Sequence, residues 1–564
     1  MKPLFYLTVT FLSIICGCVS GENQRLIAGF GGEIEEAHFQ RFRESGLNAH
    51  FLCIRPAPQM SFTQDTRGRW QGAMPADKRE SYVNKARLAE KHGIDLYFVV
   101  AYFSEYVTQL KETLGPYTRA YVQGPTRYIS PGEKDAPGPL EQRYWLGQLL
   151  AEAKFVAELS RTCPNVKGFL IDVEMYAGDM MWRGNSSFDD QTFVAVTTQM
   201  QQKKLWNHGL DPAKVDRDKR YDWLYENNLI KHYFAIQEQL VSDVAREFRS
   251  EIDAINPDLA LGMLPYEVNW FYNAWLKGLA NDRTPVMVTS EAEYNSGYTP
   301  SVPAVVSYLK TLDIEFRYMP GYYFYRHSPK QLGFHAGRAL DNCNGYWMFT
   351  TYSIWQPDPS KLHTAYRIQA PAAQYWDALR KANVENDRSQ PPDKRFSCPG
   401  YTLLTGNRHY AGSKADLPLK VTYSREPDVL FFDDPQKDKL FDGGEHESVF
   451  AAAWHAKTGE EVSAVIDLSR PVSIEKLRLS GGHILSYCPS VVSGGIDILT
   501  SMDGEVYYHI AFETLYEGRG KNVPEMVYDR LGIKARYVKV LLKTKHANKN
   551  DVWTLSELAI WGTP

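Results

Sequence analysis

The chain has 564 residues, which exceeds one ordinary domain, so two or three domains are expected. Its formal net charge of −4 at pH 7 gives no polybasic signature, and nucleic acid is therefore not an expected partner. Hydrophobic residues make up 44% of the chain, enough for large cores, and aromatic residues make up 13%. Because such rings stack on sugars as well as filling cores, this content is only a first hint of a carbohydrate ligand.

Residues 1–20 have the layout of a secretory signal peptide. An apolar run over residues 4–15 follows Lys2, small residues come next, and the run is short for a membrane span. The sequence Ile15-Cys16-Gly17-Cys18 is similar to a bacterial lipobox with Cys18 as the lipidated residue, and ordinary cleavage after Ser20 or Gly21 is the alternative. Both interpretations predict an exported protein that is periplasmic, an outer-membrane lipoprotein or extracellular. Only a lipid anchor at Cys18 would bring it to a membrane.

Residues 21–386 repeat a strand followed by a helix. The expected strands are Arg25–Phe30, Ala49–Arg55, Ile94–Phe103, Lys167–Tyr176, Leu259–Leu264, Val286–Tyr294, Glu315–Tyr323 and Gly345–Trp355. The expected helices are Glu36–Ser45, Asp77–His92, Leu140–Arg161, Leu229–Ile255, Glu267–Ala280, Val302–Leu312, Pro329–Leu340 and His363–Lys381. Eight such alternations describe a (β/α)8 TIM barrel. The polar stretch Ala177–Tyr221 is longer than a plain connector and is a candidate functional insertion.

The fourth expected strand ends in two acids, Asp172 and Glu174. Residues i and i+2 of a strand point to the same side, so the two carboxylates lie side by side at the end of the strand where barrel enzymes do their chemistry. Two close carboxylates do not both ionise freely, and one becomes a proton donor near neutral pH. A helix cap or an ion pair is the alternative role for this pair.

Acids and aromatic residues also stand at other expected strand ends. Strand six offers Glu291 and Glu293, again two positions apart, and strand seven offers no acid at its end. The candidate substrate-binding residues are Tyr176, Tyr294, Tyr322 and Trp355. Tyr318, Tyr322, Tyr323 and Tyr325 alternate along strand seven, so some of them must be core. With no HExxH sequence, phosphate-binding loop or nucleophile elbow, carboxylates with aromatic residues favour glycoside hydrolysis without a catalytic cofactor.

Two mechanisms fit this placement. In the first, Glu174 protonates the leaving oxygen while Asp172 orients an N-acetyl group of the substrate, which attacks the anomeric carbon. In the second, Glu174 is the acid and a glutamate of strand six, Glu291 or Glu293, acts from across the barrel as nucleophile or base. Asp172 and Glu174 are about 6.6 Å apart at Cα on one strand, and this is a poor arrangement for flanking a glycosidic bond from both sides.

The segment around strand four resembles the chitinase-type signature, DG-hydrophobic-D-hydrophobic-D-x-E, whose final Glu is the acid. Gly168, Asp172 and Glu174 match that signature, whereas Lys167 and Leu170 stand where the family has acids. The tryptophan that floors the sugar subsite in that family corresponds to Trp355. The resemblance covers about ten residues and implies a distant glycosidase-like barrel rather than a chitinase proper.

The polar, Pro-rich residues 387–394 mark a boundary, and residues 387–436 form a linker or hold the first strands of the next domain. Residues 437–564 contain short strands with frequent turns, a pattern typical of an all-β sandwich. They resemble the discoidin, or coagulation factor V/VIII type C, carbohydrate-binding fold in LFDG (440–443), VIDLSRP (465–471), SMDG (501–504), ARYVKVL (535–541) and LSELAIWG (555–562). The resemblance implies a structural calcium ion held by Asp442 and Glu557. Candidate sugar-contacting loop residues are Trp454, His455, His483 and Tyr487.

Two hypotheses from different classes follow. The first is an exported glycoside hydrolase that acts on a glycan or polysaccharide, with Glu174 as acid, Asp172 as its partner and the β-sandwich as a glycan-binding module. The second is a non-catalytic glycan-binding protein with a degenerate glycosidase barrel, which the missing strand-seven acid and the altered signature favour.

Overall fold

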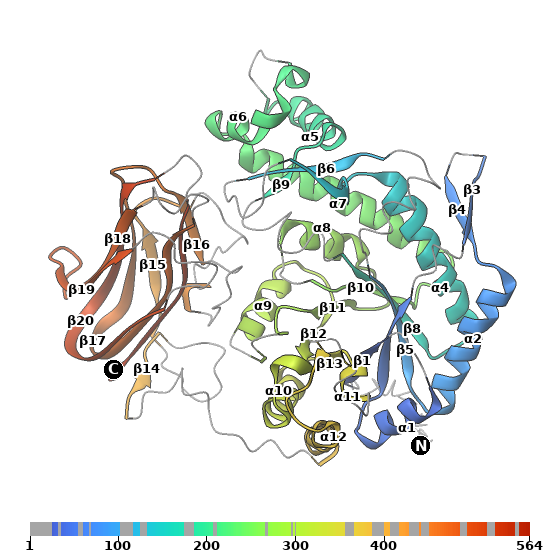
Figure 1. Cartoon of the computed structure of the whole chain (residues 1–564). Helices are drawn as coiled ribbons and strands as arrows, with labels where there is room; N and C mark the ends of the chain where they lie inside the picture. The colour runs from blue at the N-terminus through green and yellow to red at the C-terminus, as the bar shows by residue number, and fades with distance from the viewer. Residues whose placement is uncertain are drawn as a thin grey trace, which may run out of the picture.

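The computed structural model places two folded regions, a barrel with inserted segments and a C-terminal antiparallel sheet (Figure 1). It describes residues 25–31, 35–54, 60–66, 69–101, 117–124, 132–173, 185–206, 211–265, 269–294, 297–298, 301–355, 362, 366–385, 400–405, 417–427, 439–441, 451–485, 493–515, 525–547 and 552–563. Within these ranges, no helix combines the length and the apolar composition that crossing a bilayer requires. The expected signal peptide with Cys18 lies outside them.

Eight parallel strands close into a barrel, as the strand pattern predicts. Around the barrel they are β1 (Leu26–Gly31), β13 (Gly345–Phe349), β12 (Phe316–Tyr323), β11 (Val286–Ser290), β10 (Ala260–Met263), β8 (Val166–Asp172), β5 (Asp95–Ala101) and β2 (Ala49–Ile54). Each strand is paired in parallel with its neighbours, which fixes all eight C-terminal ends at one mouth. Four positions separate β8 from β13 in this circle, so these two strands lie on opposite sides of the barrel.

Helices stand between successive barrel strands in the chain. They are α1 (Glu36–Glu44), α2 (Ala76–Lys91), α4 (Leu150–Thr162), α7 (Ile230–Asp253), α8 (Trp270–Leu279), α9 (Ser301–Lys310), α10 (Pro329–Asn342) and, after the last strand, α12 (Ala372–Arg380). Two small sheets interrupt the alternation: β3 (Ser61–Gln64) with β4 (Trp70–Ala73), and β6 (Arg119–Gln123) with β7 (Gly132–Pro137) and β9 (Ser186–Ser187). A π-helical segment, η2 (Arg143–Leu149), leads directly into α4.

The apolar character of β8 explains its central place. The strand reads VKGFLID, and all its residues except Lys167 are buried, as expected for a strand covered on both faces. Leu170 points into the barrel interior, whereas Phe169 and Ile171 pack in the layer between barrel and helices. A side chain at Gly168 would collide with Tyr97 at 2.5 Å, so glycine is required where this ring crosses the lumen.

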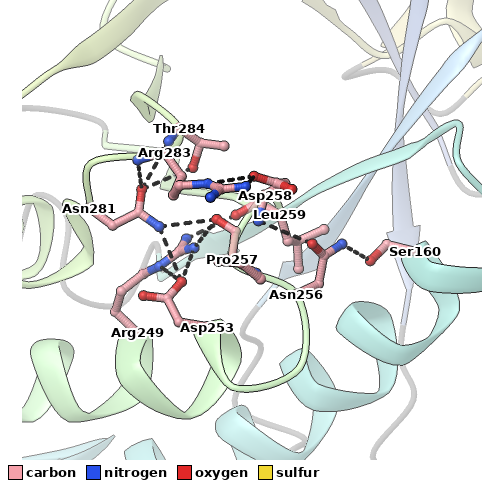
Figure 2. A network of polar contacts seen from close by, with 10 residues as sticks. All are labelled: Ser160, Arg249, Asp253, Asn256, Pro257, Asp258, Leu259, Asn281, Arg283 and Thr284. Carbon is pink, nitrogen blue, oxygen red and sulfur yellow. Dashed lines mark hydrogen bonds and ion pairs between the residues drawn. The ribbon is translucent and has the colours of Figure 1, made fainter.

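A polar network surrounds the turn between α7 and β10, at the end of the barrel opposite the mouth (Figure 2). The buried guanidinium of Arg249, in the last turns of α7, donates hydrogen bonds to the carbonyls of Leu259 and Pro257, both at 2.9 Å, and to the Asp253 carboxylate, with Nε at 2.7 Å. The Asn281 amide donates to Asp253 and to the Pro257 carbonyl, each at 3.1 Å. Because these side chains bond the carbonyls of Pro257 and Leu259, they tie the turn before β10 to the last turns of α7.

Three expected strands end earlier than the pattern predicts. Strand four was expected to reach Tyr176, but β8 ends at Asp172. Strand six was expected to reach Tyr294, but β11 ends at Ser290, and residues 291–294 form a turn. Strand eight was expected to reach Trp355, but β13 ends at Phe349, and Tyr352–Trp355 form the short helix α11. The strand-eight prediction was wrong because Thr350, Thr351 and Tyr352, which favour strands, continue past the strand end. The strand-six prediction was wrong because the alternating acids Glu291 and Glu293 read as a continuing strand although the chain turns there.

The C-terminal region is an antiparallel sheet folded over its own core. Its strands are β14 (Thr402–Leu403), β15 (Lys420–Tyr423), β16 (Ala452–His455), β17 (Glu461–Leu485), β18 (Ser493–Ser501), β19 (Tyr508–Leu515), β20 (Glu525–His546) and β21 (Val552–Thr563). The long strands β17 and β20 pair along most of their length, while β15 pairs with the first part of β17 and β21 with the second. Their inward side chains enclose a separate apolar cluster. Because β14 and β15 pair with β21 and β17, the 387–436 segment supplies strands of this sheet.

The long insertion after β8 is a small helical unit. It contains α5 (Asp190–Gln202), η5 (Pro212–Lys214), η6 (Arg217–Lys219) and α6 (Arg220–Glu226), and its apolar residues form a cluster of their own with part of α7. The unit contacts the C-terminal sheet, since the Tyr225 ring lies 4.5 Å from the ring of His455 on β16. The Tyr221 hydroxyl lies 3.5 Å from His455 Nε2. The insertion therefore joins the barrel to the C-terminal sheet at a second place besides the chain itself.

Candidate functional site at the barrel mouth

Asp172 is the acid that the structure places at the barrel mouth. It is the last residue of β8, pairs in register with Ala101 of β5, and is only 6% exposed. It continues the alternation of Gly168 and Leu170, whose side points into the barrel. Glu174 and Tyr176, expected to follow it, lie outside the described residues.

Aromatic side chains line the opposite side of the barrel. Phe349, the last residue of β13, stacks with Tyr294 at 5.6 Å between ring centroids and packs against Tyr323 of β12 at 5.4 Å and Phe30 of β1 at 5.2 Å. Two residues deeper, Trp347 is fully buried and donates from Nε1 to the Ser290 carbonyl at 3.1 Å, which fixes the ring across the lumen. Three neighbouring strands therefore supply one apolar wall that faces the strand of Asp172.

Glu291 joins this mouth, as expected for a strand-six acid. It follows β11 directly, is 3% exposed, and accepts a hydrogen bond from the Tyr294 hydroxyl at 3.2 Å. Its backbone N–H donates to the Pro265 carbonyl at 2.8 Å, which ties the turn to the neighbouring end of β10. Because β10 separates β8 from β11, two strand spacings of about 4.8 Å separate the backbones of Asp172 and Glu291 by roughly 10 Å.

Glu293 lies elsewhere, in the layer between the barrel and its helices. Its carboxylate accepts a hydrogen bond from the Tyr318 hydroxyl at 2.8 Å, and Tyr318 points out of the barrel into that layer. Burial raises the pKa of Glu293 to about 7, while hydrogen bonds from the side chains of Ser290 and Tyr318 act in the opposite direction. The structure therefore separates the two acids of strand six, and Glu293 is not brought together with Asp172.

Two expected substrate-binding residues are also placed away from the lumen. Tyr322 is fully buried in the helix layer, where its hydroxyl donates to the His335 carbonyl at 3.1 Å. Trp355, expected to floor a sugar subsite, sits in α11 with its ring edge-on to His38 of α1 at 3.7 Å and 6.4 Å from Trp376 of α12. Neither faces the wall formed with Phe349.

The aromatic residues that line the mouth are partly ones that the sequence reasoning missed. Tyr294 was expected there, but Trp347, Phe349 and Tyr323 were not. Strand alternation is the signal that could have found them, because residues 345, 347 and 349 share a face, as do 319, 321 and 323. Tyr318 and Tyr322, on the other face of β12, are core residues, as the alternation of tyrosines required.

Of the two residues expected to hold a calcium ion, only Glu557 lies in the described ranges. Glu557 is buried in β21 opposite Ser480 of β17, and Asp442 lies outside the described residues. Within the described ranges, no group of three or more His, Cys, Asp or Glu side chains gathers as a metal site. His455, a candidate sugar contact, is 5% exposed and packs against Tyr225, while Trp454 is fully buried and donates to the Arg425 carbonyl at 2.7 Å. The side chain of His483 and all of Tyr487 are outside the described parts.

Comparisons with known proteins give similarity over about a quarter of the chain. No protein-family model matches it, and no curated protein matches it. Among solved structures, the CBM32 of AlyQ in complex with 4,5-unsaturated mannuronic acid is 18% identical, covering 25% of this chain and 92% of that one, with a TM-score of 0.18. CBM32-3 from a family 31 glycoside hydrolase of Clostridium perfringens is 18% identical, covering 26% and 92%, with a TM-score of 0.19. The C-terminal domain of a chitobiase from Bacteroides fragilis is also 18% identical, covering 26% and 94%, with a TM-score of 0.19. At this level the likeness does not establish a family, so function must be argued from the site.

Proposed function

We propose that this chain is an exported glycoside hydrolase that acts on a complex glycan, with a (β/α)8 TIM barrel as catalytic domain and a discoidin-like carbohydrate-binding domain behind it. One observation carries the proposal: the buried carboxylate of Asp172 ends β8 on the side of the barrel opposite the aromatic wall of Phe349. An acid facing aromatic rings suits a sugar, because a pyranose has an apolar face for stacking and oxygen atoms for protonation.

The proton donor in this proposal is Glu174. It lies two residues beyond Asp172, the last residue of β8, at the C-terminal end of the strand where barrel enzymes do their chemistry. In this role Glu174 is the protonated carboxyl that gives its proton to the leaving oxygen, a state that a charged carboxylate beside it would favour. The glycosidic bond then breaks at the anomeric carbon, and the leaving sugar departs as an alcohol.

The partner of Glu174 distinguishes the two mechanisms. If the substrate carries an N-acetyl group, Asp172 orients its amide for attack on the anomeric carbon. If it does not, Glu291 is the strand-six acid at the mouth, and its backbone distance from β8 leaves room for a water molecule or a sugar between them. Glu293 is not a candidate for the acid across the barrel, because its carboxylate accepts a hydrogen bond from the Tyr318 hydroxyl in the layer between barrel and helices.

The experiment is hydrolysis of aryl glycosides, with and without a 2-acetamido group, by the wild type and three variants. Glu174→Gln is expected to lower kcat at least about a hundredfold on every cleaved substrate. Asp172→Asn should do so on 2-acetamido substrates if the substrate assists, whereas Glu291→Gln should do so if a carboxylate acts across the barrel. Glu293→Gln is the matched control and should keep wild-type kcat. Full activity of Glu174→Gln would refute the assignment of the acid.

A non-catalytic glycan-binding protein is the second candidate function. One observation favours it: β12 reads FRYMPGYY and contributes no carboxylate to the mouth, although strand seven carries the nucleophile in many retaining barrel enzymes. In that case the wild type binds glycans but cleaves none of the substrates.

Export, lipidation at Cys18 and a structural calcium ion at Asp442 and Glu557 are further parts of the proposal. Cleavage and acylation are tested by mass spectrometry of the protein expressed in a bacterial host, with Cys18→Ser as the variant that should lose the lipid. Calcium is tested by thermal unfolding with EDTA and with added Ca2+. The wild-type midpoint should rise with Ca2+, and the Glu557→Gln midpoint should not.

A further inference from the structure

The aromatic wall at the barrel mouth continues past the end of β12. The chain enters the short 3-10 helix η7 (Phe324–Arg326) directly after Tyr323, so these residues lie on the mouth side of the barrel. The Tyr325 ring packs 5.9 Å from that of Tyr323, and the Tyr366 ring packs 6.1 Å from that of Phe349. We refer to Tyr323, Tyr325 and Tyr366 as the tyrosine rim.

Hydrogen bonds hold the tyrosine rim in place. The Gln369 side chain donates from Nε2 to the Tyr325 carbonyl at 2.9 Å, and the Gln369 backbone N–H donates to the Tyr375 hydroxyl at 3.2 Å. That hydroxyl, on α12, donates in turn to the His327 carbonyl at 2.9 Å. The segment after Tyr366 is therefore tied both to η7 and to α12. Rings that are already in place lower the entropic cost of binding a sugar.

Arg326 is an exposed cation beside the tyrosine rim. Its guanidinium lies over the Tyr325 ring, 5.0 Å from the ring centroid. It is also near Tyr323, since burial and Tyr366 raise the pKa of Tyr323 whereas the charge of Arg326 acts in the opposite direction. Within the described parts of the chain, no carboxylate lies within ion-pair distance of this guanidinium. Its charge is therefore available to a ligand at the rim.

The chemistry of this arrangement suits an anion. A guanidinium over an aromatic face keeps its N–H donors in its own plane, where a carboxylate or a sulfate accepts two hydrogen bonds from it. Asp172 and Glu291 are buried at the strand ends, and their carboxylates would repel an anionic group placed beside the bond to be cleaved. An anionic substituent therefore fits on a sugar at the rim rather than on a sugar between the two acids.

We propose that the tyrosine rim and Arg326 form a subsite for an anionic sugar of the glycan substrate, in which Tyr325 packs against the sugar ring and Arg326 binds its carboxylate or sulfate group. This inference rests on the proposed function, because the subsite borders the same barrel mouth, and it names the substrate class as an acidic polysaccharide. A carboxylate and a sulfate are both bidentate acceptors for arginine, so the test includes one polymer of each kind.

The experiment measures binding of the full chain to two matched pairs of polymers by isothermal titration calorimetry. Polygalacturonate and its fully methyl-esterified form test the carboxylate, and dextran sulfate and dextran test the sulfate. In at least one pair the wild type should bind the charged member more tightly, and about 0.5 M NaCl should weaken that binding. Arg326→Gln should weaken binding to the charged member about fivefold and leave binding to the neutral member unchanged. Arg326→Lys keeps the charge without the planar fork of donors and should bind with intermediate affinity.

Two control variants make the result specific. Arg87→Gln removes an exposed arginine of α2, away from the rim, and should bind like the wild type. Tyr325→Ala should weaken binding to both members of the pair about fivefold, whereas Tyr401→Ala, which removes an exposed tyrosine of the C-terminal region, should not. Because Arg326→Gln and Arg87→Gln change exposed side chains, their unfolding midpoints should stay at the wild-type value.

The outcomes that overturn the inference are distinct from failure of the hydrolase. Glu174→Gln should bind the charged polymers like the wild type, so an inactive barrel leaves the binding result unchanged. Cleavage of neutral glycans with no effect of Arg326→Gln on binding would refute the subsite and leave the proposed function standing. No preference for the charged member in either pair, equal losses in Arg326→Gln and Arg87→Gln, or tighter binding to single-stranded DNA than to either charged polymer would each refute the inference.

Discussion

The sharpest prediction on pH concerns Glu293, the acid buried between the barrel and its helices. Its ordinary pKa of 4.5 is raised to about 7 in the folded protein, with burial as the main cause. Below pH 4.5 the carboxyl is protonated in both states. Between pH 4.5 and 7 the unfolded chain releases the proton while the folded chain keeps it, so the free energy of unfolding falls as pH rises. A difference of 2.5 pKa units corresponds to a loss of about 3 kcal/mol, complete above pH 7.

Glu293→Gln removes this loss. A neutral amide still accepts the hydrogen bond from Tyr318, so the variant should match the wild type within about 1 kcal/mol at pH 4.5 and exceed it by about 3 kcal/mol at pH 8. The measurement is urea unfolding of both proteins at half-unit steps of pH, followed by tryptophan fluorescence and circular dichroism. Other titrating groups cancel in the difference between the two proteins. A difference that stays constant from pH 4.5 to 8 would refute the reasoning.

Two further predictions concern single side chains that tie segments together: Arg249 at the turn before β10, and Tyr225, which joins the insertion to the C-terminal sheet. Arg249→Met should lower the free energy of unfolding by about 3 kcal/mol, because it leaves the Leu259 carbonyl without its side-chain donor and the Asp253 carboxylate without its cation. Arg283→Met breaks an exposed ion pair of the same network and should cost under about 0.5 kcal/mol, so equal costs in urea unfolding would contradict this. Tyr225→Ala should lower stability by about 1 kcal/mol through lost contact with His455, and retention of the wild-type unfolding curve would argue that the insertion does not hold the C-terminal sheet.

The order of the barrel strands could be predicted because each carries a local signal. Continuous apolar runs such as the one in β8 are buried on both faces, and the helices between them show a helical period. The ends of the strands were harder to predict than their order. The chain after β13 continues with Thr350, Thr351 and Tyr352, which favour strands. It nevertheless forms α11, in which Trp355 packs against His38 of α1 and Trp376 of α12. No local pattern contains that tertiary contact.

In the candidate site, too, the sequence predicted local features but not those that depend on tertiary contacts. Asp172 was found because a carboxylate at the end of an apolar strand is a local feature. Glu291 and Glu293 could not be told apart from the sequence, since both follow the same strand and alternation puts residues two positions apart on the same side. What separates them is the turn at residues 291–294, which directs Glu291 to Tyr294 at the mouth and Glu293 to Tyr318 in the helix layer. Side-chain direction after a strand end depends on turn geometry that alternation does not predict.

The most direct test of the proposed function is hydrolysis of a panel of glycans and aryl glycosides by the wild type and by Glu174→Gln, with Glu293→Gln as the control variant. The proposal predicts that the wild type and Glu293→Gln release sugar from the same substrate at comparable rates, while Glu174→Gln releases it at least about a hundredfold more slowly. Release of sugar by Glu174→Gln at the wild-type rate would contradict the proposed acid. Binding of glycans with no cleavage by any of the three proteins would contradict the hydrolase itself.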